Sequence, residues 1–394
     1  MKAVQFGAGN IGRGFLGQLY FETGYETTFV DVLPEVVEGL KQRGAYPLRI
    51  VGEGSRTITV GNVTAVHGAD VEAVGVALAE AELAATAVGV NVLPRVAPAI
   101  ARGIAKRFEG SSPRPLNIIV CENMIDAGPF LREEVRKHLP SDLHDALDAH
   151  VGFVEASIGR MVPLMTEAMR AEDPLLVCVE EYCELPVDAN GFRGPIPPLN
   201  HMVPRSNFKA YVEQKLFVHN AGHAATAYLG YLRRHEYIWQ AISDVRVRAA
   251  ADAAMAETCA GLAAKHGLPI EDLRDHWKDL VRRFQNRALG DQVVRVANDP
   301  IRKLGPKDRL IGAGLMCLDN GIDAEHIAFA AAAAIRYDYA GDPAAQKLEA
   351  VFREHGMRGV LTQVCQIPED SRLAELIGKG AQRLHAEGWM DFGF

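Results

Sequence analysis

Three polar residues in the second half of the chain have the types and spacing that proton transfer at an oxygen atom requires. They are Lys215, Asn220 and His223, within the segment KLFVHNAGHA at 215–224. In a helix, about 100° per residue places the three within an arc of roughly 140°. The apolar residues at 216–218 would desolvate the lysine, which lowers its pKa toward that of a useful general base. Asn220 could donate to a carbonyl or developing alkoxide, and His223 could orient the same oxygen or relay a proton.

Each of these residues also has an ordinary structural explanation. A lysine on a helix is usually a solvated charge, an asparagine before Ala-Gly can cap a helix, and a single histidine is often a satisfied structural side chain. The segment alone leaves both interpretations open.

The N-terminus carries glycines in a pattern that is typical of dinucleotide binding. An apolar strand at 2–6 runs directly into the loop residues Gly7, Ala8, Gly9, Asn10, Ile11 and Gly12. The glycines permit a tight turn, close approach of the backbone to a pyrophosphate, and packing of the next helix against the strand. The N-terminus of that helix offers free N–H groups to phosphates.

Asp31 ends a second strand, at 27–30, roughly 20 residues past the last glycine, where a carboxylate accepts hydrogen bonds from the ribose hydroxyls of NAD. The same carboxylate would repel the 2′-phosphate of NADP. We therefore predict NAD as the cofactor. The alternative is a similar sheet whose crevice binds nothing.

Two further apolar runs end in residues suited to ligand contact. The run 83–88 ends at Val88 and Gly89, and the run 116–121 is followed by Glu122 and Asn123. Residues just after parallel strands face the ligand crevice of an open α/β sheet. We expect Val88 and Gly89 to contact the cofactor.

The order of the predicted elements indicates an α/β fold with two domains. Alternating strands and helices predict an N-terminal, Rossmann-like doubly wound sheet over residues 1–195, with 151–154 and 175–179 as further strands of the sheet. Residues 196–394 are predicted to form a mainly α-helical substrate and catalytic domain. At 394 residues the chain is too long for one compact core.

Charge and composition exclude several classes of partner. A net charge of −8 disfavours nucleic acid and anionic membranes. The chain has neither an apolar run long enough to cross a bilayer nor a leader before its first strand, so we expect a cytoplasmic protein. Six scattered cysteines without a CxxC pair predict reduced thiols and no metal site.

Four segments together resemble the polyol-specific long-chain dehydrogenase/reductase family. They are GAGNIGRGF at 7–15, CENM at 121–124, HVGF at 150–153 and KLFVHNAGHAATAYLG at 215–230. The resemblance covers most of the chain, and its lysine, asparagine and histidine spacing is far more specific than the glycine loop.

The resemblance implies a metal-independent oxidoreductase, often monomeric, that interconverts D-mannitol 1-phosphate and D-fructose 6-phosphate. The family uses NAD or NADP by subgroup, and Asp31 favours NAD here. It implies that Lys215 is the general acid/base and that Asn220 and His223 bind and polarise the reacting oxygen. It also places Asn123 near the nicotinamide and the substrate. One position departs from the family, where relatives commonly carry an aspartate and this chain has Gly159. Glu155 is a speculative replacement.

A phosphorylated substrate needs cations, and a short segment concentrates them. We expect phosphate contacts from Arg302, Lys303 and Arg309, with Lys307 beside them, although a solvated loop would have the same composition. Arg13 and Arg160 are weaker candidates.

Two other functions stay open. One is an NAD-dependent dehydrogenase of a non-phosphorylated polyol or hexuronate, of the mannitol 2-dehydrogenase or tagaturonate/fructuronate reductase type, which the glycine at 159 keeps possible. The other is a dinucleotide-binding sensor without chemistry, against which the intact Lys215, Asn220 and His223 argue.

Overall fold

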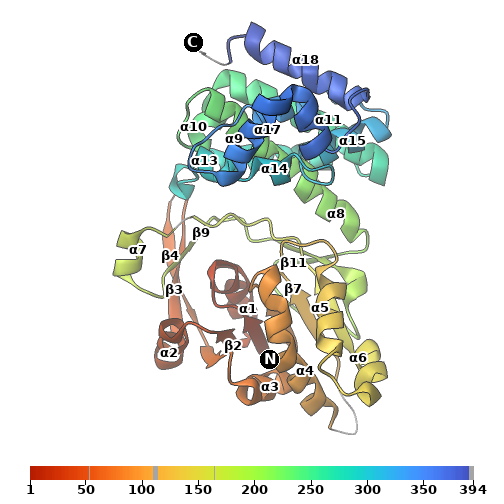
Figure 1. Cartoon of the computed structure of the whole chain (residues 1–394). Coiled ribbons are helices and arrows are strands. Elements are labelled where there is room, and N and C mark those ends of the chain that lie inside the picture. The colour runs from red at the N-terminus through yellow and green to blue at the C-terminus, as the bar shows by residue number, and fades with distance from the viewer. Residues whose placement is uncertain (53, 110–113, 164, 390–394) are drawn as a thin grey trace. The chain divides into compact units, whose positions relative to one another are not determined.

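The computed structural model describes residues 1–52, 54–109, 114–163 and 165–389. The chain forms two compact units, Met1–Phe208 and Lys209–Phe394, which Figure 1 shows in a colour gradient along the chain. The sequence predicts a cofactor domain at 1–195 and a substrate domain at 196–394, and this assignment of functions stays a prediction. By contacts, the strand pair β10 (Leu185–Asp188) and β11 (Met202–Arg205) lies within the first unit.

A six-stranded parallel sheet forms the centre of the first unit. Its spatial order is β5-β2-β1-β6-β7-β8, so the strand order reverses between β1 and β6. This is the order of doubly wound dinucleotide-binding sheets, and the predicted fold class is confirmed. The strands are β1 (Lys2–Phe6), β2 (Glu26–Asp31), β5 (Val63–His67), β6 (Leu83–Thr86), β7 (Leu116–Val120) and β8 (Val151–Glu155).

Alternate side chains of these strands enter two different cores, because successive residues of a strand point to opposite faces. Val4 and Phe6 belong to the core under α3 (Val71–Glu80), α4 (Leu93–Phe108) and α5 (Ala127–Arg136). Ala3 belongs to the opposite core, under α1 (Gly17–Thr23). Figure 1 shows α3, α4 and α5 beside one another, with α6 (His144–His150) next to them.

A separate three-stranded sheet corrects one expectation. β3 (Ala45–Ile50) and β4 (Arg56–Gly61) form an antiparallel hairpin, and β9 (Val177–Val179) pairs in parallel with β3 and does not extend the main sheet. Val177 and Val179 pack against the backbone at Gly14, where a Cβ would come within 2.8 and 2.9 Å of their methyl groups. α2 (Pro34–Arg43) precedes this hairpin, and α7 (Glu167–Glu172) precedes β9.

The second unit is helical, as predicted. Its longest helix, α11 (Val245–His266), begins where the Asp244 side chain accepts from two backbone N–H groups and ends at Gly267. The buried helix α16 (Glu325–Ile335) packs against α9, α11 and α18, and its alanine run allows this close approach. The other helices are α8 (Phe208–Gln214), α9 (Ala221–Leu232), α10 (Ile238–Ser243), α12 (Ile270–Phe284), α13 (Val293–Ala297), α14 (Pro300–Lys303), α15 (Ile311–Asp319), α17 (Pro343–Gly359) and α18 (Arg372–Ala386).

A carboxylate from α11 holds the N-terminus of α16. Both oxygens of Glu257 accept from the N–H of His326, at 2.9 and 3.0 Å, and one also accepts from the N–H of Ile327 at 3.0 Å. Burial raises the pKa of Glu257 to about 7, and the neighbouring Asp323 and Glu325 act in the same direction. The backbone donors oppose this shift without cancelling it.

Glu257 makes the stability of the protein depend on pH near neutrality. Because its pKa is higher in the folded chain than in the unfolded one, its contribution to the free energy of unfolding falls as pH rises from about 4.5 through about 7. We expect the wild type to lose on the order of 1 kcal/mol more than Glu257→Gln between about pH 5 and pH 9, after allowance for solvent screening. Urea unfolding at the two pH values measures this. Glu349→Gln is the surface control, and parallel pH curves for wild type and Glu257→Gln would contradict the assignment.

Candidate active site

The glycine loop lies at the point where the strand order of the main sheet reverses. Gly7 has a positive φ of 88° and donates its N–H to Val30 O at 2.8 Å. A Cβ at Gly7 would overlap the carbonyl of Ala87 after β6, and one at Gly12 would overlap the carbonyl of Gly7. A Cβ at Gly9 would meet nothing within 4 Å among the described atoms. The first and last glycines therefore satisfy internal packing, and Gly9 keeps the loop open on the outside.

Asp31 links the end of β2 to this loop. One carboxylate oxygen accepts from the N–H of Ala8 at 2.7 Å. The other accepts from the N–H groups of Val32 and Leu33, at 2.7 and 3.0 Å. A carboxylate has about four acceptor sites, so room remains for a hydroxyl donor. The prediction from the sequence placed Asp31 at the end of a strand but did not include its bond to the loop.

The helix after the glycine loop begins with a π-helical turn, Gly12–Leu16. The carbonyl of Arg13 in this turn accepts from the Tyr46 hydroxyl at 2.6 Å. The Arg13 guanidinium donates to Ala8 O at 2.5 Å and to Leu175 O at 2.6 Å. Arg13 is buried and holds the loop from within, so the structure does not support the weaker expectation that it binds phosphate.

The donors of Arg160 are likewise taken up by acceptors within the protein. Its buried guanidinium donates to Glu180 O, to Gly14 O at 3.0 Å and to the side-chain oxygen of Gln18 at 2.7 Å. Burial lowers its pKa to about 10. Internal acceptors take up the donors that a phosphate would need.

A buried carboxylate, Glu122, organises the second loop at the switch point. Its two oxygens accept from the N–H groups of Val88 and Gly89, each at 2.9 Å. Burial raises the pKa of Glu122, while these backbone donors act in the opposite direction. The next residue, Asn123, is exposed. The N–H groups of Val88 and Gly89 thus both bond to Glu122. The only sequence feature that points to this role of Glu122 is its position just after a strand.

The structure does not place Glu155 as a substitute for the acid missing at Gly159. The Glu155 carboxylate accepts from the N–H groups of Ala127 and Gly128 at the start of α5. A Cβ at position 159 would be 3.4 Å from the Tyr182 ring, an ordinary contact distance. The glycine at this position is not required by local packing.

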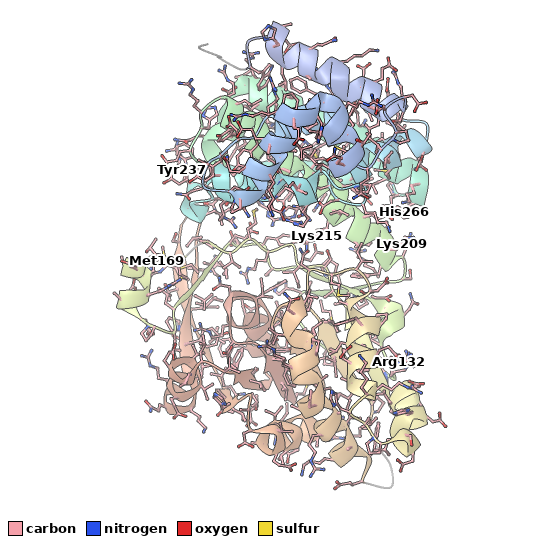
Figure 2. All side chains as sticks on the ribbon, in the orientation of Figure 1. Arg132, Met169, Lys209, Lys215, Tyr237 and His266 are labelled. Atoms are coloured by element: carbon pink, nitrogen blue, oxygen red, sulfur yellow. The ribbon has the colours of Figure 1, made fainter. Side chains whose placement is uncertain are left out.

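In the second unit, Lys215 and Asn220 begin and end a π-helical turn, Lys215–Asn220, between α8 and α9. Figure 2 shows Lys215 just past the end of α8, on which Lys209 lies. The expectation of regular α-helical spacing is wrong here, because the N–H of Ala221 bonds five residues back, to Leu216 O. A turn closed by i→i+5 bonds brings residues five apart closer to one face than an α-helix does.

His223 follows on α9, and its imidazole is held on two sides. Its ring stacks on Phe284 of α12, with centroids 4.6 Å apart and planes 14° apart. Its Nε2 lies 3.0 Å from Oδ2 of the buried Asp291. Asp291 also accepts from Arg295 Nε at 2.8 Å. No sequence pattern singles out Phe284, Asp291 or Arg295, because they lie about 60 or more positions after His223 in the chain.

Further buried cationic and imidazole groups surround this turn. Burial lowers the pKa of His219 well below its usual range, and Arg283, His223, His276 and Lys215 act in the same direction. Burial also lowers the pKa of His276 to about 4. These two histidines are therefore neutral near pH 7, so the charge of the buried Arg283 is not joined by charged imidazoles.

The glycine of the motif has a packing role. A Cβ at Gly222 would lie 2.5 Å from the Trp277 ring and 3.0 Å from the sulfur of Met255. Trp277 is fixed in turn by its indole N–H, which donates to Asp252 at 2.8 Å. The motif thus combines residues suited to chemistry with a glycine, Gly222, that lets α9 pack closely against α12.

The predicted phosphate segment is already paired with carboxylates. Arg302 bonds Asp299 at 3.1 Å and Asp308 at 3.2 Å, and Arg309 bonds Asp308 at 2.7 Å. Lys303 is buried and donates to Asn298 O, and burial lowers its pKa to about 8. A phosphate here would compete with these internal partners. Arg302, Lys303 and Arg309 remain a predicted phosphate site.

Within the described ranges, no group of three or more histidine, cysteine or acidic residues is arranged to hold a metal ion. Nor does any helix among these residues have the length and apolar character needed to cross a membrane. None of the six cysteines, all of which lie in the described ranges, forms a disulfide.

The chain belongs to the mannitol dehydrogenase family. Residues 1–201 match the mannitol dehydrogenase Rossmann domain, and residues 207–377 match the mannitol dehydrogenase C-terminal domain. A mannitol-1-phosphate 5-dehydrogenase of Brevibacillus brevis is 40% identical over 384 residues, which cover 98% of each chain. The resemblance to polyol dehydrogenases is confirmed.

Two solved structures share the fold. Pseudomonas fluorescens mannitol 2-dehydrogenase, in ternary complex with NAD and D-mannitol, has a TM-score of 0.73 at 17% identity, covering 99% of this chain and 92% of that one. A D-sorbitol dehydrogenase in substrate-free form has a TM-score of 0.81 at 17% identity, covering 98% and 93%.

Proposed function

We propose that this chain is an NAD-dependent dehydrogenase that interconverts D-mannitol 1-phosphate and D-fructose 6-phosphate. The observation that carries the proposal is the Lys215–Asn220 π-helical turn followed by His223, in a chain that is similar over nearly its whole length to a mannitol-1-phosphate 5-dehydrogenase. The predicted division of labour assigns the cofactor to residues 1–195 and the substrate groups to residues 196–394. We also propose a cytoplasmic monomer.

The first unit has the features that NAD requires. The loop at residues 7–12 keeps Gly9 open toward a pyrophosphate, and the Asp31 carboxylate retains acceptor capacity for a ribose hydroxyl. The bonds from Glu122 hold the backbone at Val88 and Gly89 in place. When bound, NAD accepts or supplies the hydride.

The remaining chemistry belongs to side chains of this protein. Lys215 takes the proton of the substrate hydroxyl when the alcohol is oxidised and returns it to the carbonyl oxygen in the reverse direction. Asn220 donates to the same oxygen, and His223, held by Asp291 and Phe284, orients it. Asn123 contacts the substrate beside the nicotinamide. The proton moves between the substrate oxygen and Lys215, so no metal takes part in this scheme.

One observation leaves a second substrate class possible. Gly159 leaves the space beside Tyr182 without a carboxylate that relatives commonly have, so a non-phosphorylated polyol or a hexuronate is the second candidate. We assign the phosphate contacts to Arg302, Lys303 and Arg309.

An NADH-oxidation screen decides the substrate. We expect fructose 6-phosphate to be strongly preferred over fructose, tagaturonate and fructuronate. Arg302→Gln and Arg309→Gln should each raise KM for fructose 6-phosphate about tenfold, because a charge-assisted hydrogen bond is lost, and leave activity on fructose unchanged. Arg353→Gln removes an equal charge from α17 as the control. Preference for a hexuronate would replace the proposed substrate with the second candidate.

Removing the amine of Lys215 should abolish proton transfer with little effect on folding. We expect Lys215→Ala to lower kcat about 10²- to 10⁴-fold, measured in both directions with saturating substrate. Lys209→Ala, an exposed lysine on the preceding helix (Figure 2), should retain the wild-type rate. Near-normal turnover by Lys215→Ala would exclude its assignment as the acid/base.

Removing the charge of Asp31 should narrow the preference for NAD over NADP. We expect the ratio of kcat/KM for the two cofactors to fall about tenfold in Asp31→Asn, which corresponds to about 1.4 kcal/mol. The ratio is the relevant readout, because loss of the bond to Ala8 weakens the loop for both cofactors. Asp70→Ala, which removes a cap of α3, is the control for general destabilisation. A ratio unchanged by Asp31→Asn would exclude Asp31 as the discriminating group.

A further inference from the structure

One buried carboxylate contacts a residue of the proposed active site but takes no direct part in the proton transfer described above. Asp291 lies between the turn Arg287–Leu289 and α13, with its side chain against His223. Its backbone is fixed because its carbonyl accepts from the N–H of Ile238 at 2.8 Å. The adjacent Gln292 forms a bridge with Tyr237. Asp291 is therefore held on a rigid support.

The Asp291 carboxylate is ionised and divides its two oxygens between two partners. Oδ2 lies 3.0 Å from His223 Nε2, and Oδ1 accepts from the Arg295 guanidinium. Burial by itself would raise the pKa of Asp291, but His223 and Arg295 outweigh burial and lower it. A buried carboxylate that stays charged beside an imidazole is a strong electrostatic constraint on that ring.

Two contacts of different kinds then restrict the His223 ring. The stacked Phe284 ring fixes the plane of the imidazole, and the Asp291 carboxylate fixes which edge faces it. Asp291 Oδ2 lies within ion-pair distance of Nε2, but in this arrangement the buried Nε2 makes no hydrogen bond with the described residues. The negative charge beside Nε2 still favours the tautomer that carries the proton on that nitrogen. Nδ1 is the nitrogen that remains for another partner.

We propose that Asp291 is a positioning residue for the proposed reaction, which fixes the ring orientation of His223 and keeps the proton on its Nε2. This inference rests on the assignment of His223 to the reacting oxygen, but the state of the ring can be tested without turnover. Arg295 bonds Oδ1 of Asp291, and His223 Nε2 lies near the other oxygen, Oδ2.

Nitrogen-15 NMR of histidine-labelled full-length protein, without cofactor or substrate, tests the proton position. His223→Gln identifies the His223 signals by their loss. We expect the wild type to show protonated Nε2 at neutral pH, and Asp291→Asn to show a mixture of tautomers. Asp244→Asn is the matched control, because Asp244 faces His235 Nε2 at 3.1 Å elsewhere in the same unit. An unchanged His223 tautomer in Asp291→Asn overturns the proposal.

Kinetics of the same variants provide the second readout. Asp291→Asn should lower kcat about 10- to 100-fold, the usual effect of losing a group that orients a catalytic side chain, with little change in KM. Asp244→Asn should keep kcat while losing some stability, because it removes the ion pairs with Arg233 and His235. An equal fall of kcat in both variants would indicate a structural effect and would contradict the proposal. If wild-type protein oxidised no polyol, the proposed function would fail, and the NMR result would still decide whether Asp291 sets the His223 ring.

Discussion

The cofactor edge of the first unit depends on the absence of side-chain atoms where the glycine loop meets the sheet. A methyl group at Gly12 would overlap the Gly7 carbonyl, and one at Gly7 would overlap the carbonyl of Ala87. Close-packed interiors have no free volume to absorb such overlaps. The loop after β1, the helix that follows and the loop after β6 can therefore approach one another only with glycine at both positions.

Three carboxylates then hold the backbone segments near these glycines and at one helix end by hydrogen bonds to N–H groups. Asp31 bonds the backbone of Ala8, and Glu122 bonds the backbone of Val88 and Gly89. In the second unit Glu257 does the same for the N-terminus of α16. Each of them satisfies backbone N–H groups that would otherwise lack a partner at a loop or helix end. These three carboxylates thus fix backbone geometry near functional or buried segments.

A π-helical turn, Gly12–Leu16, follows the glycine loop, and a second one, Lys215–Asn220, contains two residues of the predicted catalytic motif. Such turns are rare and recur at functional sites. In the first, the displaced Arg13 carbonyl is satisfied by the Tyr46 hydroxyl. In the second, the extra residue in the turn sets the relative placement of Lys215 and Asn220. A regular helix would have produced a different arrangement of the same three side chains.

The sequence by itself determined the order of elements, the doubly wound sheet, the helical second unit and the residue types of the glycine loop and of the Lys215, Asn220 and His223 motif. These follow from local patterns, because hydrophobic periodicity and glycine placement act over a few residues. It also predicted that β9 would join the main sheet and that Arg13 and Arg160 were candidate phosphate ligands, and the structure corrected both. Strand partners and hydrogen-bond acceptors are supplied by distant parts of the chain.

Only the tertiary structure decided which charged groups are already paired and which side chains support the motif. Arg302 and Arg309 face Asp299 and Asp308, and His223 meets Phe284 and Asp291 from other helices and loops. The sequence likewise did not predict the π-helical turns, because one additional residue in a turn does not change the local composition or residue spacing in a recognisable way. The physical reason is the same in each case: local sequence sets what a residue can do, while packing between distant segments sets which partner it meets.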